Sequence, residues 1–143
     1  MDRLSFEAQL LNGYKEIDTF FTAFIDNFAA RNDLSSIQIK AILEIYLRKH
    51  VSIKDLCLRL GMSKSNLSPI CKKLEGAELI RKTRDYHDQR IVNLELTEEG
   101  EKIVALLQKE VTEYARTFTK RLTEKEKEAV IKSFDCLAKV LNR

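Results

Sequence analysis

The sequence predicts a mainly α-helical fold with one small β-hairpin, an α+β fold in which helices dominate. Four glycines and one proline in 143 residues leave few points at which a helix must stop. Apolar residues recur at helical spacing over most of the chain and alternate with polar ones only near residues 92–96. With 44% hydrophobic and 33% charged residues, the chain can bury the core of one domain, and this composition excludes a disordered chain.

The first predicted helix, residues 6–28, is strongly aromatic. Six of the eleven Phe and Tyr residues lie in it, Tyr14 and Phe21 among them on one stripe. A single small domain does not need so aromatic a stripe, so we expect a second chain to cover it. The next helix begins with Ser35 and Gln38, a capping box, and is expected to end near His50.

Two short helices are predicted to follow, joined by a turn at Gly61. Ser52 and Ser63 are their expected N-caps, and glycine tolerates the left-handed backbone that such a turn needs. The second of the two carries Ser, Asn and Lys on its outward side. This pattern predicts a helix-turn-helix whose second helix can enter a major groove, and the alternative is an ordinary helical hairpin.

A cationic hairpin is predicted next, with strands at residues 79–84 and 91–96 and a polar tip at residues 85–90. The segment from Arg59 to Arg90 holds eight basic and four acidic residues, whereas the whole chain has a net charge of only +3. The excess positive charge therefore falls where the predicted shape suits DNA. A solvated basic face is the alternative interpretation.

Two more helices complete the prediction. One begins after Thr97 and runs without a breaker to about Arg121, which is longer than a compact globule of this chain length is wide. The last begins with Thr123 and Glu126, a second capping box. We expect a single domain over residues 1–143, with dimerisation helices at about 1–31 and 101–143 and a DNA-binding lobe at about 34–100.

The hairpin and the start of the following helix carry a specific motif. Asp88-Gln89-Arg90 followed by Leu96-Thr97-Glu98-Glu99-Gly100 resembles the wing motif of the MarR family of winged helix-turn-helix transcription regulators. The resemblance extends over essentially the whole chain. Two departures are visible: Glu78 stands where the family often has glycine, and Pro69 lies inside the recognition helix, where we expect a local kink without a break.

The resemblance implies a homodimer on a pseudo-palindromic stretch of double-stranded DNA, with recognition helices in major grooves and wings in minor grooves. It implies that Arg90 enters the minor groove and that Asp88 orients it. The candidate contacts to bases and nearby phosphates are Ser63, Lys64, Ser65, Asn66 and Ser68, and those to the DNA backbone are Lys72, Lys73, Lys82 and Arg84. The alternative for Asp88 and Arg90 is a solvated surface ion pair.

The regulatory signal is less marked in the sequence. In the resembling family, ligand pockets lie between the dimer helices and the DNA-binding lobe, so Tyr14, Phe21 and Tyr46 are candidate lining residues for a small-molecule effector, with core packing as the alternative. Cys57 and Cys71 fall on apolar stripes and are interpreted as core residues. Redox sensing, at Cys71 or at Cys136, is the alternative signal.

No metal site, cofactor or enzymatic motif is expected. The two histidines, His50 and His87, are interpreted as solvated loop residues, and no phosphate-binding loop or nucleophile motif occurs. No apolar run approaches the length of a membrane span, so we expect a cytoplasmic protein with no membrane partner.

The expected function is that of a DNA-binding regulator, most simply a repressor released by a signal. The alternative is a protein-interaction adaptor that does not bind DNA.

Overall fold

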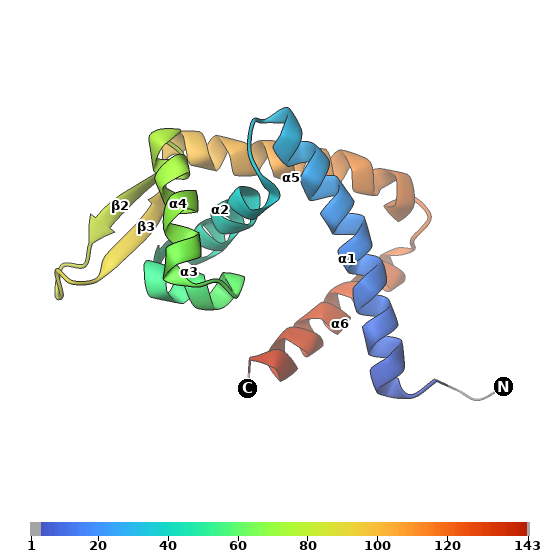
Figure 1. Cartoon of the computed structure of the whole chain (residues 1–143). Coiled ribbons are helices and arrows are strands. Elements are labelled where there is room, and N and C mark those ends of the chain that lie inside the picture. The colour runs from blue at the N-terminus through green and yellow to red at the C-terminus, as the bar shows by residue number, and fades with distance from the viewer. Residues whose placement is uncertain (1–3, 143) are drawn as a thin grey trace. The chain divides into compact units, whose positions relative to one another are not determined.

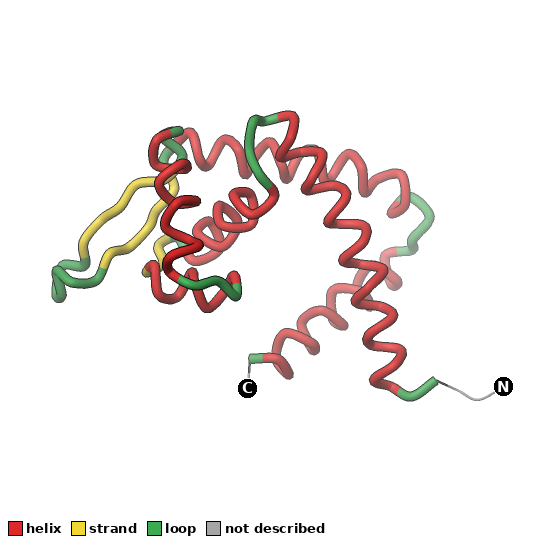
Figure 2. The backbone as a smooth tube through the Cα atoms, in the orientation of Figure 1, coloured by secondary structure: helices red, strands yellow, loops and turns green. Residues whose placement is uncertain are grey.

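The computed structural model describes residues 4–142 and consists mainly of helices with one small sheet (Figures 1 and 2). The elements are α1 (Phe6–Arg31), α2 (Ser36–Arg48), β1 (His50–Ser52), α3 (Ile53–Leu60), α4 (Lys64–Gly76), β2 (Ile80–Arg84), β3 (Val92–Leu96), α5 (Glu98–Thr119) and α6 (Glu124–Leu141). The predicted fold class is confirmed.

Polar caps begin the helices where the sequence predicted them. Ser35 and Thr123 form complete capping boxes, and the side chains of Ser52 and Ser63 each accept a backbone N–H from the first turn of their helix. Gly61 ends α3 in the left-handed conformation, at φ 62°. These local signals set the boundaries of the helix-turn-helix formed by α3 and α4.

The sheet has three antiparallel strands in the order β1-β3-β2. In the hairpin Ile80 pairs with Leu96, and on the other side of β3 Val51 pairs with Leu94. Helix α2 ends at Arg48, close to the expected end near His50. One expectation was wrong: His50 lies in a strand although it was expected in a loop. The cause is Lys49, whose φ of 66° turns the chain away from the helix and into β1.

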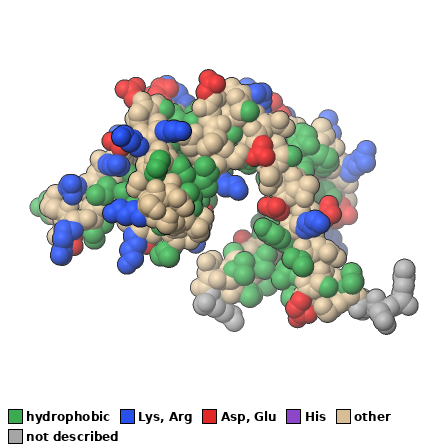
Figure 3. Space-filling view, viewed as in Figure 1, with side chains coloured by type: hydrophobic (Ala, Val, Ile, Leu, Met, Phe, Trp, Pro, Cys, Tyr) green, Lys and Arg blue, Asp and Glu red, His purple; other side chains and the backbone are tan. Residues whose placement is uncertain are grey.

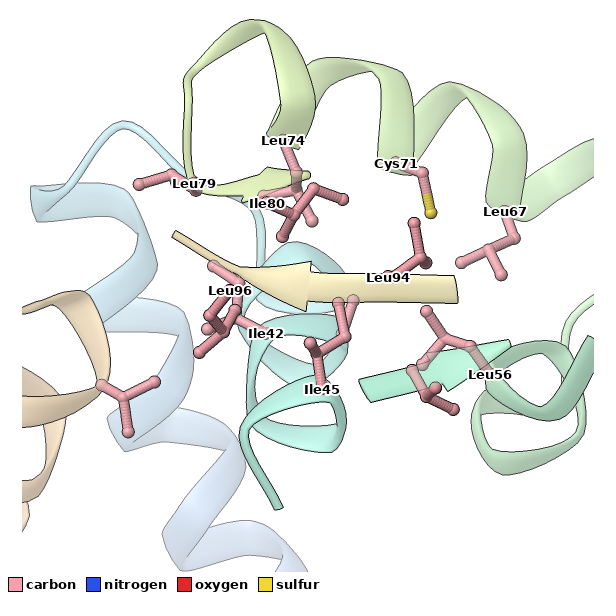
Figure 4. Packing of buried hydrophobic residues seen from close by; sticks show 13 residues of the cluster. Ile42, Ile45, Leu56, Leu67, Cys71, Leu74, Leu79, Ile80, Leu94 and Leu96 are labelled. Carbon is pink, nitrogen blue, oxygen red and sulfur yellow. The ribbon is translucent and has the colours of Figure 1, made fainter. Parts of the chain in front are cut away.

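The core joins the helix-turn-helix to the sheet (Figure 4). Leu56 of α3, Leu67 of α4 and Leu94 of β3 are each fully buried, and Ile45 of α2 lies in the same cluster. At roughly 1.5 to 3 kcal/mol for each fully buried aliphatic side chain, this packing holds the orientation of α4 against the wing.

The chain divides into two compact units, Met1–Leu107 and Gln108–Arg143. In the first unit, α1 buries side chains only near its C-terminal end, at Ile25, Phe28 and Ala29. In the second unit, no described side chain of α6 is buried, and Ile131 and Phe134 are among its exposed apolar residues. Among the described helices, none is both long and apolar enough to span a lipid bilayer.

Candidate nucleic-acid interface

The outward side of α4 is polar, as the sequence predicted. Leu67, Cys71 and Leu74 are its buried residues, so the residues between them point away from the core. Ser63 caps the helix by accepting the backbone N–H of Asn66 at 3.3 Å, and its hydroxyl lies 3.0 Å from that of Ser65. Every candidate contact on this helix is exposed: Ser63, Lys64, Ser65, Asn66, Ser68, Lys72 and Lys73.

The basic side chains of the lobe differ in how they are engaged. Lys64, Lys72 and Lys73 form no ion pair with any residue that the structure describes. Lys82 pairs with Glu75 of α4 at 3.4 Å, and Arg84 donates to the carbonyl of Gln89 at 2.7 Å. Lys82 and Arg84 therefore also stabilise the wing. Figure 3 shows basic side chains over the wing and the neighbouring helices.

The tip of the wing is held in place by its own hydrogen bonds. The carboxylate of Asp85 accepts the backbone N–H groups of His87 and Asp88 at 2.8 and 3.0 Å. The backbone N–H of Asp85 donates to the carbonyl of Ile91 at 2.9 Å, which closes the loop at its base. The loop therefore presents Arg90 from an ordered backbone.

Asp88 and Arg90 form a two-pronged ion pair. Nε and Nη2 of Arg90 donate to the two carboxylate oxygens of Asp88 at 3.1 and 3.2 Å, and the backbone N–H of Arg90 donates to the same carboxylate at 3.0 Å. The side-chain hydrogen bond from Arg90, aided by the backbone bond, lowers the pKa of Asp88. The Arg90 side chain remains 91% exposed, so the pair orients the guanidinium without covering it.

A set of contacts joins the exit of α4 to the start of α5. Glu78 adopts a φ of 60°, the conformation that glycine adopts at little cost, so the sequence departure at this position changes the residue and keeps the left-handed turn. Thr97 donates its hydroxyl to the carbonyl of Glu78 and accepts the backbone N–H of Gly100. A Cβ at Gly100 would overlap the carbonyl of Leu79. The Thr-x-x-Gly part of the motif therefore serves as a clasp at residues 78, 79, 97 and 100.

Pro69 lies inside α4, and the helix continues through it from Lys64 to Gly76. The expectation that the helix persists is confirmed. Because proline has no backbone N–H, it leaves the helix with one fewer internal hydrogen bond near its exposed side.

The three cysteines are free and differ in exposure. Cys71 is buried in α4, with its sulfur directed toward β3 (Figure 4), whereas Cys57 is half-buried and Cys136 is exposed. Burial raises the pKa of the Cys71 thiol, which disfavours the thiolate that oxidation requires. Cys71 therefore fits a core residue better than a redox sensor. The described residues contain no group of His, Cys, Asp or Glu side chains arranged to hold a metal ion.

The candidate effector residues lie apart from the core. Tyr46 lines a hollow of about 550 Å³ beside Lys49, Arg81 and Glu101, but Tyr14 and Phe21 do not line it. Tyr14 is 62% exposed on α1, and Phe21 is 44% exposed. Core packing within one chain therefore does not explain these aromatic residues.

Sequence reasoning missed Lys54. It lines a second hollow, of about 690 Å³, together with Lys64 and Arg90, and Asp55 lines it as well. The residues next to Lys54 in the sequence do not indicate that it lies near Lys64 and Arg90, because α3, α4 and the wing loop meet only in the folded lobe.

Comparisons with known proteins agree with this fold. Residues 32–91 match the model of the MarR family. The HTH-type transcriptional regulator SarZ of Staphylococcus aureus is 30% identical over 92 residues, which cover 64% of this chain and 52% of that protein. TtmR of Methylorubrum extorquens, another HTH-type transcriptional regulator, is 27% identical over 99 residues, 69% of this chain and 51% of that protein. The chain thus spans about half the length of these relatives.

Solved structures share the fold over almost the whole chain. A MepR mutant from S. aureus has a TM-score of 0.81 at 20% identity, covering 98% of this chain and 99% of that one. MarR from E. coli has a TM-score of 0.70 at 19% identity and covers 99% of both chains. Another MepR mutant from S. aureus, bound to an oligodeoxyribonucleotide, has a TM-score of 0.66 at 20% identity, covering 97% and 99%. These structures show that the chain has the winged helix-turn-helix fold, and the match of residues 32–91 supports a relationship to the MarR family.

Proposed function

We propose that the chain is a sequence-specific, double-stranded DNA-binding transcription regulator. The observation that carries the proposal is that one compact unit presents two exposed polar elements that suit DNA. These are the N-terminal turn of α4 and a wing in which Arg90 is hydrogen-bonded to Asp88. Two relatives are named as transcriptional regulators, and one structural neighbour is bound to an oligodeoxyribonucleotide.

The chemistry of α4 suits the major groove. Asn66 and Lys64 offer donors, and in the case of Asn66 also an acceptor, that match base edges, while the hydroxyls of Ser65 and Ser68 suit bases or phosphates. The positive end of the helix favours phosphate at the same place. Lys72 and Lys73, exposed further along the helix, are suited to the DNA backbone.

The wing suits the adjacent minor groove. A narrow minor groove has a strongly negative potential that attracts an inserted arginine. Arg90 is exposed and held by Asp88, so little side-chain freedom is lost when it enters.

The proposed regulator is a homodimer. Large apolar side chains are exposed along α1, where Tyr14 and Leu11 are examples, and along α6, where Ile131 and Phe134 are examples. Exposed apolar surface of this extent is costly in water and is what a second copy of the chain would bury. Two copies place two recognition helices on a pseudo-palindromic site.

We further propose repression that a small molecule or another signal relieves. The names of the relatives support regulation, and the hollow beside Tyr46 offers a space in the same lobe as α4.

The test is a comparison of two duplexes, one selected by the protein from a random pool and one with the same bases scrambled. At moderate salt we expect the selected duplex to bind on the order of a thousandfold more tightly or better. In Asn66→Ala, loss of a base contact should reduce this preference by about 1 to 3 kcal/mol. Asn27→Ala, at an exposed position of α1, serves as the control and should keep the preference. Equal affinity of the wild type for both duplexes would refute the proposal and favour a protein-interaction adaptor.

A further inference from the structure

We propose that the hollow between α3, the start of α4 and the wing binds one sugar–phosphate segment of the DNA, and that Lys54 holds a phosphate there. The inference rests on the proposed DNA-binding function and extends it to a residue outside the recognition helix and the wing.

Three elements supply the basic side chains of this hollow. Lys54 comes from α3, Lys64 from α4 and Arg90 from the wing loop, and Asp55 is the acidic residue that lines it. Lys54 and Lys64 have no ion-pair partner among the described residues, and Arg90 keeps an exposed guanidinium beside Asp88. The lining therefore carries an excess of positive charge that is free to meet an anion.

The remainder of the lining is largely apolar: Ile53, Leu58, Met62, Ile91 and Val92. Leu58 is 73% exposed, an unusual position for a leucine unless a partner covers it. A deoxyribose phosphate combines an anionic group with apolar C–H faces. The charge and the apolar surface of the hollow therefore fit the same chemical unit.

The position of the hollow fits the path of a DNA strand. A recognition helix in the major groove and a wing in the neighbouring minor groove are separated by one sugar–phosphate strand. Because Lys64 of α4 and Arg90 of the wing line the same hollow, it lies between the two elements, where that strand must pass. Lys54 lines it from α3 and is placed to contact a phosphate of the strand.

The first experiment measures the affinity of Lys54→Gln for the selected duplex and for the scrambled duplex over a range of salt concentrations. Loss of one phosphate contact should weaken binding to both duplexes about equally, by roughly three- to tenfold, and reduce the salt slope by about 0.9. Lys40→Gln, on the exposed side of α2 and outside the hollow, should leave affinity and slope unchanged. Asp55→Asn removes the acidic lining residue and should tighten binding by about two- to fivefold.

The second experiment locates the contact. Each phosphate of one half-site is replaced in turn by an uncharged methylphosphonate, and both proteins are measured. The wild type should lose affinity when the phosphate between the helix and wing contacts is neutralised, and Lys54→Gln should be insensitive to that one position.

The outcomes separate the two proposals. If the wild type prefers the selected duplex but Lys54→Gln binds with unchanged affinity and slope, the inference about the hollow is wrong and the proposed function stands. A small anion with an apolar ring, such as 2-naphthoate, tests the other use of the hollow. If it binds there and displaces DNA while Lys54→Gln keeps full affinity for DNA, the hollow is a small-molecule site and the inference is wrong. If the wild type shows no preference, the proposed function itself fails.

Discussion

Glu78 holds a backbone conformation that L-amino acids with a side chain disfavour. Its φ is 60°, and its side chain is exposed at the exit of α4. A non-glycine residue in this region costs roughly 1 to 2 kcal/mol, because its Cβ approaches the neighbouring backbone. We therefore expect Glu78→Gly to raise the free energy of unfolding by about 1 kcal/mol, after the larger chain entropy of glycine is subtracted.

Urea denaturation measures this change. Glu128→Gly, inside α6, is the control: it should lower the free energy of unfolding by about 1 kcal/mol, since glycine is unfavourable inside a helix. A loss of stability in Glu78→Gly would contradict the strain assigned to this turn.

Arg90 is the residue on which the wing's proposed function depends. Because its side chain is 91% exposed and an exposed ion pair contributes little to folding, Arg90→Ala should change the melting temperature only slightly while weakening DNA binding by about 1 to 3 kcal/mol. A variant that binds as tightly as the wild type would exclude Arg90 from the interface.

The same variant should also change the titration of Asp88. Arg90 lowers the pKa of the Asp88 carboxyl, so its contribution to folding is present above the ordinary Asp range and lost as the pH falls through the lowered pKa. In Arg90→Ala the pKa of Asp88 should rise toward its ordinary value, which carboxyl chemical shifts can measure by NMR. An unchanged titration would mean that the ion pair is not formed in solution.

At the scale of elements, the clasp between the exit of α4 and the start of α5 connects the recognition helix to the rest of the lobe. Gly100 is buried against the Leu79 carbonyl, which already accepts the backbone N–H of Thr97 at 3.1 Å. Gly100→Ala must displace this backbone, so we expect it to lower the free energy of unfolding by about 3 kcal/mol or more.

Gly76→Ala is the matched control, because a Cβ at Gly76 meets open space in the last turn of α4. It should stabilise the protein by about 0.5 to 1 kcal/mol. Equal effects of the two substitutions, measured by thermal unfolding, would show that the clasp is not tightly packed.

The sequence predicted most elements because their signals are local. The caps at Ser35, Ser52, Ser63 and Thr123 and the left-handed stop at Gly61 depend only on residues within one turn. The same holds for the outward face of α4, since helical spacing alone divides Leu67 and its buried neighbours from the polar side chains.

Strand β1 and the second hollow could not be predicted in this way. His50–Ser52 is too short to show a pattern and exists because the edge of β3 offers it hydrogen bonds from more than forty positions away. Lys54 acquires its neighbours Lys64 and Arg90 only when α3 packs against the wing. Likewise, the contacts of Lys82 with Glu75 and of Arg84 with the Gln89 carbonyl form only in the folded hairpin. The sequence showed only the charge of Lys82 and Arg84, from which we predicted DNA contacts.

At the scale of the whole molecule, the proposed dimer explains why α1 and α6 leave large apolar side chains exposed. The first unit buries its hydrophobic cluster around α2, α4 and the sheet, while much of α1 remains exposed. The second unit buries none of the described side chains of α6. A second copy would cover both apolar faces and set a fixed distance between two recognition helices.

That fixed distance makes the spacing of half-sites the most direct test of the central claim. The wild type is measured against duplexes that carry two copies of the selected half-site, with the distance between their centres increased one base pair at a time. We predict that affinity is highest at about one helical turn, roughly 10 to 10.5 base pairs, and falls sharply half a turn away, since one recognition helix then faces the wrong side of the duplex. Affinity that does not vary with spacing would contradict a dimer that reads two successive major grooves.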